Sequence, residues 1–346
     1  MPRLRRVDCS GPGIVRRRAG RGFTYLNGNG NRVTDPEVLE RIRALAIPPA
    51  WNEVWICPHP MGHIQAVGTD AAGRRQYRYH DVWRARRDQE KFDNMLEFAR
   101  CLPALRKGLG RHLEHEGLTR ERVLACATRL LDLGFFRIGT EGYAEQNQTY
   151  GLATIQRRHV RVRDDMVTFD YAAKGGKRRI QAIVDPEVCA VVRELKVPRR
   201  GHPELLAWRA GRHWVDVKST DINAFVKETT GGDFTAKDFR TWSATVLAAV
   251  ALAVSSEAAT SKTARKRAET RAIKEVAHYL GNTPAVSRAS YVDPRVVDRY
   301  RAGVTIAGAL HRLGAGTAFG QLSTQGAIER AVLDLLDDAP AARLAA

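Results

Sequence analysis

The chain has 346 residues, of which 44% are hydrophobic and 27% are charged, and these proportions are ordinary for a globular protein. Its 56 Lys and Arg residues outnumber the 38 Asp and Glu residues, which gives a formal net charge of +18. A charge of this sign attracts polyanions, and because no apolar run approaches the ~20 residues of a membrane helix, we expect nucleic acid rather than a membrane as the partner.

The first part of the chain, residues 1–90, is predicted to be mainly β. Phe23–Leu26, the turn-rich Asn27–Asn31 and then Arg32–Val33 indicate a hairpin. Asp35–Ala46 is predicted as one helix, with a polar cap and a proline in its first turn. Further short strands separated by Pro and Gly clusters are predicted at Trp55–Cys57, Ile64–Val67 and Gln76–Tyr79.

From about Asp88 onward the apolar spacing becomes helical, so residues 91–346 form a second, larger and mainly helical domain. One interruption predicts a small antiparallel sheet whose strands are His159–Arg163, Met166–Tyr171 and Arg179–Ile183. Later helices are predicted at Pro186–Lys196, Ser219–Thr230, Ala236–Val254, Lys262–Leu280 and around Ala327–Leu336. The polar stretch Ser255–Ser261 is expected to be mobile. The fold class is therefore α+β.

Five cysteines are scattered along the chain and form no Cys-x-x-Cys pair, so neither a disulfide framework nor a zinc site is indicated. Together with an amino terminus that lacks the apolar region of a signal peptide, this pattern favours a cytoplasmic, nucleoid-associated protein. No Walker loop or paired-carboxylate metal site is present in the sequence. We therefore expect no cofactor, no metal and no nucleotide.

Four residues in chain order fit the cleavage of a phosphodiester without a metal: Arg137, Lys174, Arg240 and Tyr291. Arginines match phosphate geometry, a lysine can protonate the leaving oxygen, and a tyrosine can form a covalent phosphoryl-enzyme. Each residue alone has an ordinary structural explanation. Arg137 could meet the dipole at the end of an apolar helix, Lys174 could be a solvated turn residue, and Tyr291 could be a surface tyrosine. Arg240, in the first turn of its helix, is better explained by a phosphate.

The contexts of these residues resemble the poxvirus-like branch of the type IB DNA topoisomerases, over about residues 22–300. The strongest motifs are Arg137–Leu152, Lys174–Lys177, Lys237–Thr241 and Leu280–Pro284 followed by Tyr291. The resemblance implies that Tyr291 attacks the phosphate, Lys174 protonates the 5′ oxygen, Arg137 and Arg240 bind the nonbridging oxygens, and Asn282 donates to one of them. It also implies DNA contacts by Tyr143, Lys177 and Lys237.

Asn282 stands where many members of this family carry histidine. An amide can donate a hydrogen bond but cannot exchange protons, so we assign Asn282 hydrogen bonding alone. Thr140 replaces a lysine of the viral enzymes, which removes the basis for a backbone contact there. Lys177 is an alternative to Lys174 as the acid, although the family pattern favours the first lysine of the turn.

In the first domain, residues 74–80 resemble the family's groove-reading strand. Gln76 could hydrogen-bond a base edge in the major groove, while Tyr77 and Tyr79 offer hydroxyl groups to bases or phosphates. The alternative is an ordinary strand with aromatic cross-strand pairs.

The resulting hypothesis is a monomeric clamp whose two domains close on duplex DNA, nick one strand through Tyr291, let the duplex rotate and reseal it. A tyrosine recombinase is the nearest alternative, but Lys237–Arg240 lacks the usual His-x-x-Arg pattern and the first domain is hairpin-rich rather than helical. A non-catalytic basic DNA-binding protein would explain the charge but not the ordered motifs.

Overall fold

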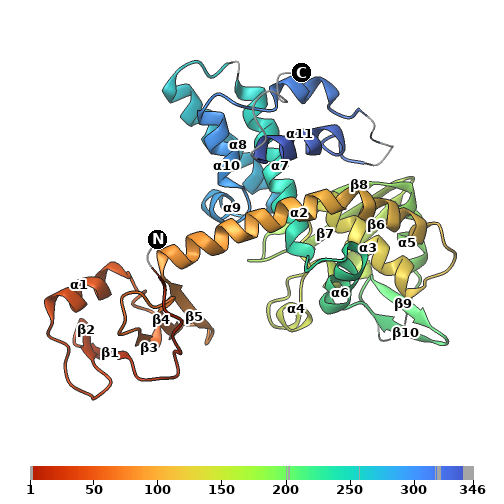
Figure 1. The fold of residues 1–346 in the computed structure, drawn as a ribbon. Coiled ribbons are helices and arrows are strands. Elements are labelled where there is room, and N and C mark those ends of the chain that lie inside the picture. Colours follow the sequence, from red (N-terminus) through yellow and green to blue (C-terminus); the bar gives the residue numbers. More distant parts are fainter. Residues whose placement is uncertain are drawn as a thin grey trace. The chain divides into compact units, whose positions relative to one another are not determined.

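A computed structural model of the chain describes residues 3–199, 201, 203–256, 258–315, 317 and 321–337. The chain divides into two compact units, Met1–Asp93 and Asn94–Ala346. The boundary lies inside one long helix, α2 (Asp81–Leu113), which Figure 1 shows as the long orange ribbon. This helix begins at Asp81, earlier than the change to helical spacing at Asp88 predicted.

The first unit is a five-stranded antiparallel sheet with one additional helix, as the β-rich prediction required (Figure 1). The strand order is β2-β1-β3-β4-β5. Its elements are β1 (Ile14–Ala19), β2 (Gly22–Leu26), α1 (Pro36–Ala44), β3 (Asn52–Ile56), β4 (Ile64–Thr69) and β5 (Arg75–Tyr79). Asp35 caps α1, because its carboxylate accepts from the backbone N–H groups of Glu37 and Val38.

The hairpin predicted for residues 23–33 is only partly correct. The turn after β2 exists, but the residues that follow it form only one β-bridge with β2 among the described residues, Leu26 to Arg32. The main partner of β2 is instead β1, a strand that was not predicted. The reason is Arg16, which occupies an inward position of β1. Its buried guanidinium donates to the carbonyls of Ile47, Pro48 and Trp51, so the strand lacks an apolar alternation.

The second unit is mainly helical with two small antiparallel sheets, and the α+β prediction is confirmed. The sheets have the orders β6-β7-β8 and β10-β9. The helices are α3 (Arg120–Gly134), α4 (Glu141–Asn147), α5 (Pro186–Leu195), α6 (Ser219–Thr230), α7 (Ala236–Ser256), α8 (Lys262–Leu280), α9 (Pro284–Ser290), α10 (Pro294–Arg301) and α11 (Ala327–Leu336). The strands and short 3-10 turns are η1 (Leu152–Thr154), η2 (Arg157–His159), β6 (Val160–Arg163), β7 (Met166–Ala172), β8 (Arg178–Val184), β9 (Ala207–Ala210), β10 (His213–Asp216) and η3 (Ala307–Arg312).

The predicted bounds of α6, α8 and α11 agree with the structure, whereas α4, α10 and the β9–β10 pair were not predicted. Helix α7 runs two residues past the predicted Val254, so Ser255 and Ser256 belong to a helix. Glu257 lies outside the described residues, and the mobility expected for residues 255–261 stays a prediction.

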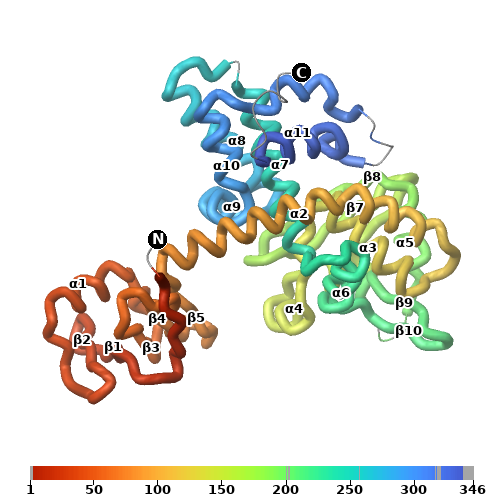
Figure 2. The backbone as a smooth tube through the Cα atoms, viewed as in Figure 1, coloured from red at the N-terminus to blue at the C-terminus, as the bar shows by residue number. Residues whose placement is uncertain are grey.

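Helix α7 packs against α3, α8, α10 and α11 in the second unit, and Figure 2 shows the tubes of α7 and α8 in the same part of that unit. Ala244 and Ala248 of α7 pack with Ile273 and Val276 of α8 in one buried cluster. By length and composition α7 could cross a membrane, with a mean hydropathy of 1.3, contrary to the expectation that no segment comes close. Yet 61% of that window is buried inside the structure, as in the core helix of a globular domain.

Candidate active site

The carboxyl-terminal end of α8 is the centre of the candidate site. Gly281 ends the helix in the left-handed conformation, with φ +63°, and the Asn282 N–H donates to the carbonyl of Ala277 over 2.9 Å. Such an end leaves several carbonyl groups without helical partners and carries the negative end of the helix dipole. It therefore attracts cations.

Three arginines from different parts of the chain donate to three consecutive carbonyls at this end. Arg179 of β8 donates to Tyr279 over 2.5 Å, and Arg240 of α7 donates to Leu280 over 3.0 Å. Arg137, in the loop after α3, donates to Gly281 over 2.8 Å. The fold thus gathers three guanidinium groups around one turn.

The loop that carries Arg137 is held by a close backbone crossing. The Arg137 carbonyl accepts from Leu152 over 2.8 Å, and the Ile138 carbonyl accepts from Ala153 over 2.7 Å. A Cβ atom at Gly151 would lie 2.5 Å from the Cα atom of Gly139, so both glycines are required for the crossing. This explains physically why the motif Arg137–Leu152 contains them.

For two of these arginines, the position predicted relative to the helix ends differs from the position in the structure. We expected Arg137 to be close to the end of its own helix, but α3 ends at Gly134 and the guanidinium meets the end of α8 instead. Arg240 is the fifth residue of α7 rather than a first-turn residue. Its side chain is buried and bridges the carbonyls of Phe135 and Leu280.

The three guanidinium groups are close enough to affect one another. Burial lowers the pKa of Arg240; Tyr291 opposes that shift, whereas the charges of Arg137 and Arg179 add to it. Burial raises the pKa of Tyr171, and the same three arginines oppose that rise. Among the described residues, these three arginines donate to backbone carbonyl and side-chain amide oxygens, and none of them donates to a carboxylate. The cluster is thus a positive site without an acidic partner, which an anion would stabilise.

Asn282 completes this cluster with a free donor. Its side-chain oxygen accepts from Arg137 over 2.5 Å. Its amide nitrogen is buried and, within the part of the chain that the structure describes, has no hydrogen-bond partner. A buried unpaired donor is costly, so an oxygen from a bound group is expected to satisfy it.

Tyr291 lies at the end of α9, next to Arg240. The Arg240 guanidinium carbon is 5.3 Å from the centre of the Tyr291 ring, and the half-buried ring packs against the buried cluster of α7 and α8. The hydroxyl of Thr245 anchors the backbone here. It accepts from the Asp293 N–H over 3.2 Å, and its single hydrogen has two carbonyls within reach, Thr241 at 2.9 Å and Tyr291 at 3.3 Å.

Lys174 is exposed at the tip of the β7–β8 hairpin, as predicted. The turn is closed by a bond from the Ala173 N–H to the Lys177 carbonyl, and Gly175 and Gly176 both have positive φ. A cavity of about 540 Å³ is lined by Lys174, Lys177, Arg137, Arg179 and Gly281, among others. The hairpin lysines therefore line the same cavity as Arg137 and Arg179, whereas Arg240, Asn282 and Tyr291 are not among its lining residues.

Four of the five predicted catalytic residues, Arg137, Arg240, Asn282 and Tyr291, thus lie together near the α8–α9 turn. Lys174 lines a cavity with Arg137 and Gly281, and the chemical roles of all five stay predictions. Two neighbours were missed, Arg179 and Thr245. Arg179 gave no clear signal, because along β8 it points inward while Ile180 is 60% exposed, the reverse of the usual alternation. Thr245 follows Arg240 on α7, but a threonine in an apolar helix predicts nothing specific.

The predicted DNA-contact residues are more dispersed. Tyr143 on α4 and Lys237 at the start of α7 are exposed, and Lys177 lines the cavity. In the first unit, Tyr77 and Tyr79 stack at 6.0 Å on β5, an edge strand.

Gln76 directly precedes these tyrosines in the sequence but does not lie on the same surface. Its amide donates to Asp70 over 2.9 Å. Because successive residues of a strand point to opposite faces, Gln76 and the two tyrosines do not share one face of the sheet. Their contacts with DNA stay predictions.

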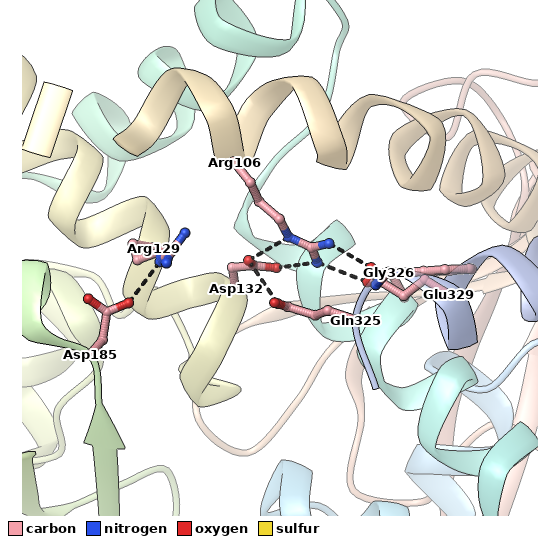
Figure 3. A network of polar contacts seen from close by, with 8 residues as sticks. Arg106, Arg129, Asp132, Asp185, Gln325, Gly326 and Glu329 are labelled. Carbon is pink, nitrogen blue, oxygen red and sulfur yellow. Dashed lines mark hydrogen bonds and ion pairs between the residues drawn. The ribbon is translucent and has the colours of Figure 1, made fainter. Parts of the chain in front are cut away.

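A buried ion network supports the segments that carry the site (Figure 3). Arg106 of α2 binds Asp132 of α3 over 2.8 Å and Glu329 of α11 over 2.6 Å. Glu329 also accepts from the indole N–H of Trp242, two residues after Arg240 on α7. The network thus joins α11 to the helices that lead to Arg137 and contain Arg240.

Comparison with known proteins gives consistent matches. The family model described as "Eukaryotic DNA topoisomerase I, catalytic core" matches residues 80–306, and "Bacterial DNA topoisomerase IB, N-terminal domain" matches residues 22–70. DNA topoisomerase 1B of Acanthamoeba polyphaga mimivirus is 29% identical over 303 residues, which cover 84% of this chain and 88% of the relative.

Two other relatives match shorter stretches. DNA topoisomerase 1B of vaccinia virus (strain Copenhagen) is 21% identical over 40% of this chain and 44% of the relative. DNA topoisomerase 1 of Schizosaccharomyces pombe is 26% identical over 45% of this chain and 18% of its own length.

Proposed function

This chain belongs to the type IB DNA topoisomerases, and from that membership we propose that it relaxes supercoiled duplex DNA by cutting and resealing one strand through a 3′-phosphotyrosyl intermediate on Tyr291. The observation that carries the proposal is the arginine cluster on three consecutive carbonyls of α8, with the unpaired amide of Asn282 and the ring of Tyr291 beside it.

In the proposed reaction the Tyr291 oxygen forms a bond to phosphorus while the bond from phosphorus to the 5′ oxygen breaks. Negative charge grows on the nonbridging oxygens, and preorganised donors stabilise it most where water is excluded. Arg137 and Arg240 supply charged donors, and the Asn282 amide supplies a neutral one. The phenol proton passes to solvent.

Lys174 is proposed to give a proton to the departing 5′ oxygen. Its exposed position at a glycine-rich hairpin tip, on the cavity that Arg137 also lines, supports this role. Resealing reverses the step: the 5′ hydroxyl attacks the phosphotyrosine and Lys174 takes the proton back. Because the phosphotyrosine retains the energy of the ester, resealing needs no ATP.

We further propose that the protein acts as a monomer in the cytoplasm, bound to nucleoid DNA. The net charge of +18 supports DNA binding, and five cysteines that are all free thiols support a reducing compartment. Size-exclusion chromatography with light scattering tests the monomer, and a mass of two chains would overturn it.

The decisive experiment is relaxation of a supercoiled plasmid in EDTA without ATP. We expect complete relaxation, and denaturation during the reaction should trap a covalent DNA adduct that peptide mapping places on Tyr291. An adduct on another residue would overturn the assignment of the nucleophile. Joining of two separate duplexes, rather than relaxation of one, would favour the recombinase alternative.

A further inference from the structure

The β7–β8 hairpin and the α8–α9 turn are joined by one side chain that no motif includes. We propose that Arg179 is a positioning residue, which holds the Lys174 hairpin against the Gly281–Asn282 turn and thereby places the acid at the scissile phosphate. This inference rests on the proposed function, because it needs Lys174 to protonate the leaving oxygen.

The hydrogen bonds of Arg179 span the two segments. Its Nε atom donates to Gln181 on the same strand over 2.8 Å, and its Nη2 atom donates to the carbonyl of Tyr279, 100 residues away in sequence. Gln181 in turn donates to the carbonyl of Gly134 at the end of α3. The Arg179 guanidinium therefore ties the hairpin stem to α8, while Gln181 ties the stem to α3, the helix that precedes Arg137.

The contact with the turn is also steric. A Cβ atom at Gly281 would lie 2.9 Å from Nη1 of Arg179 and 3.7 Å from Nη1 of Arg137. Both guanidinium groups thus approach the bare face of this glycine, whose φ of +63° no larger residue adopts easily. Arg179 occupies the space next to the residue that precedes Asn282.

A direct role on the phosphate is less consistent with these contacts. The Nε and Nη2 atoms of Arg179 are both bound to protein oxygens, whereas the Nε atom of Arg240 is buried without a hydrogen-bond partner among the described residues and is free to donate to a phosphate. Burial lowers the pKa of Arg179, Tyr171 opposes that shift and Arg137 adds to it. Burying this charged group costs free energy, and it is buried at the place where its side chain joins the segments that carry Lys174 and Asn282.

Anchoring the hairpin stem matters because no side-chain contact fixes the Lys174 amine at the tip, within the described residues. Among the described residues, the Lys174 amine has no hydrogen bond or ion pair, and two glycines with positive φ follow it. Its position is therefore set by the strands below it. Arg179 is the second residue of β8, close enough to the tip to control where Lys174 lies.

The test uses the full-length protein and two duplexes that differ only in the bridging atom at the cleavage site, 5′ oxygen or 5′ sulfur. Sulfur leaves without protonation, so only the oxygen substrate depends on the placement of Lys174. We expect Arg179→Ala to cleave the oxygen substrate on the order of 10²-fold more slowly, since small misplacements of catalytic groups have effects of that size. On the sulfur substrate its rate should stay within about threefold of the wild type, because that substrate needs no acid.

Two further variants sharpen the result. Arg179→Lys keeps the charge but loses the fork, so it should share the selective defect. Arg163→Ala is the matched control, because Arg163 is an exposed arginine on β6 of the same sheet and is not among the residues that line the cavity, and it should behave as the wild type on both duplexes.

Equal slowing of Arg179→Ala on both substrates would contradict the proposal and would instead favour a phosphate contact. Full activity of Arg179→Lys, or an equal defect in Arg163→Ala, would show that the defect reflects lost positive charge alone, and would also overturn the proposal. Failure of the proposed function is distinguishable from these outcomes, because the wild type would then form no covalent adduct with either duplex.

Discussion

Arg137 donates to the side-chain oxygen of Asn282, and this bond leaves the Asn282 amide nitrogen buried without an acceptor among the described residues. The asparagine therefore presents one acceptor to the protein and one donor to whatever binds the site. A neutral histidine has the same arrangement, with one ring nitrogen accepting and the other donating. This relationship gives a physical reason why an amide can replace an imidazole here.

The first prediction concerns this residue. Asn282→His should cleave duplex DNA at the wild-type rate or faster, because acceptor and donor are both kept. Asn282→Leu should cleave about 10²–10³-fold more slowly, the usual effect of removing a transition-state donor. Single-turnover cleavage measures both rates. An inactive Asn282→His would show that donation alone does not describe the role.

The second prediction concerns the nucleophile. Tyr291→Phe keeps the ring that packs against the buried cluster and near Arg240, so folding and duplex binding should be unchanged. Plasmid relaxation should be abolished, because no oxygen remains to attack phosphorus. Gel-shift and relaxation assays on the same preparation make the comparison, and residual relaxation would exclude Tyr291 as the nucleophile.

The third prediction concerns the acid. Lys174→Ala should slow cleavage of an ordinary duplex strongly, by about 10²–10⁴-fold, as expected for a lost general acid. Replacing the leaving oxygen with sulfur should restore most of the rate. Lys177→Ala is the matched variant from the same turn and should show no such rescue. If both substrates are slowed equally by Lys174→Ala, Lys174 is not the acid.

The fourth prediction concerns Thr245, which anchors the backbone around Tyr291. Thr245→Val has the same shape but leaves the Asp293 N–H without its hydroxyl acceptor, so the free energy of unfolding should fall by about 1–3 kcal/mol. Cleavage should also slow, because the backbone two residues after Tyr291 loses its hydrogen bond to α7. Urea unfolding and single-turnover cleavage measure the two effects.

Thr241→Val is the control for that variant. The Thr241 hydroxyl donates to the Lys237 carbonyl of its own helix, so its loss leaves no N–H group unpaired. A smaller effect than that of Thr245→Val is expected on both stability and cleavage. Equal effects would show that Thr245 has no special role at the tyrosine.

The fifth prediction concerns the buried network of Figure 3. Glu329→Ala leaves Arg106 with one carboxylate fewer and the Trp242 indole without an acceptor, so we expect a loss of about 3–5 kcal/mol in the free energy of unfolding. Asp337→Ala removes an exposed partner of Arg100 and should cost at most about 1 kcal/mol. Comparable losses in thermal unfolding would argue that the network contributes no more than a surface pair.

Much of the secondary structure could be predicted because it depends on local patterns. Helix α8 and the β7–β8 hairpin follow from apolar spacing and from turn residues that lie next to each other in the sequence. The prediction failed where a polar side chain is buried by distant partners. β1 was missed because Arg16 finds its carbonyl acceptors more than thirty residues away.

The sequence by itself determined the family and the candidate residues Arg137, Lys174, Arg240 and Tyr291, because their order and local contexts are properties of the chain. Only the tertiary structure decided that three guanidinium groups share the end of α8, that Arg179 is one of them, and that the Asn282 amide is left free. The physical reason is that a hydrogen bond to a carbonyl 100 or more residues away leaves no periodic pattern in the sequence around either partner.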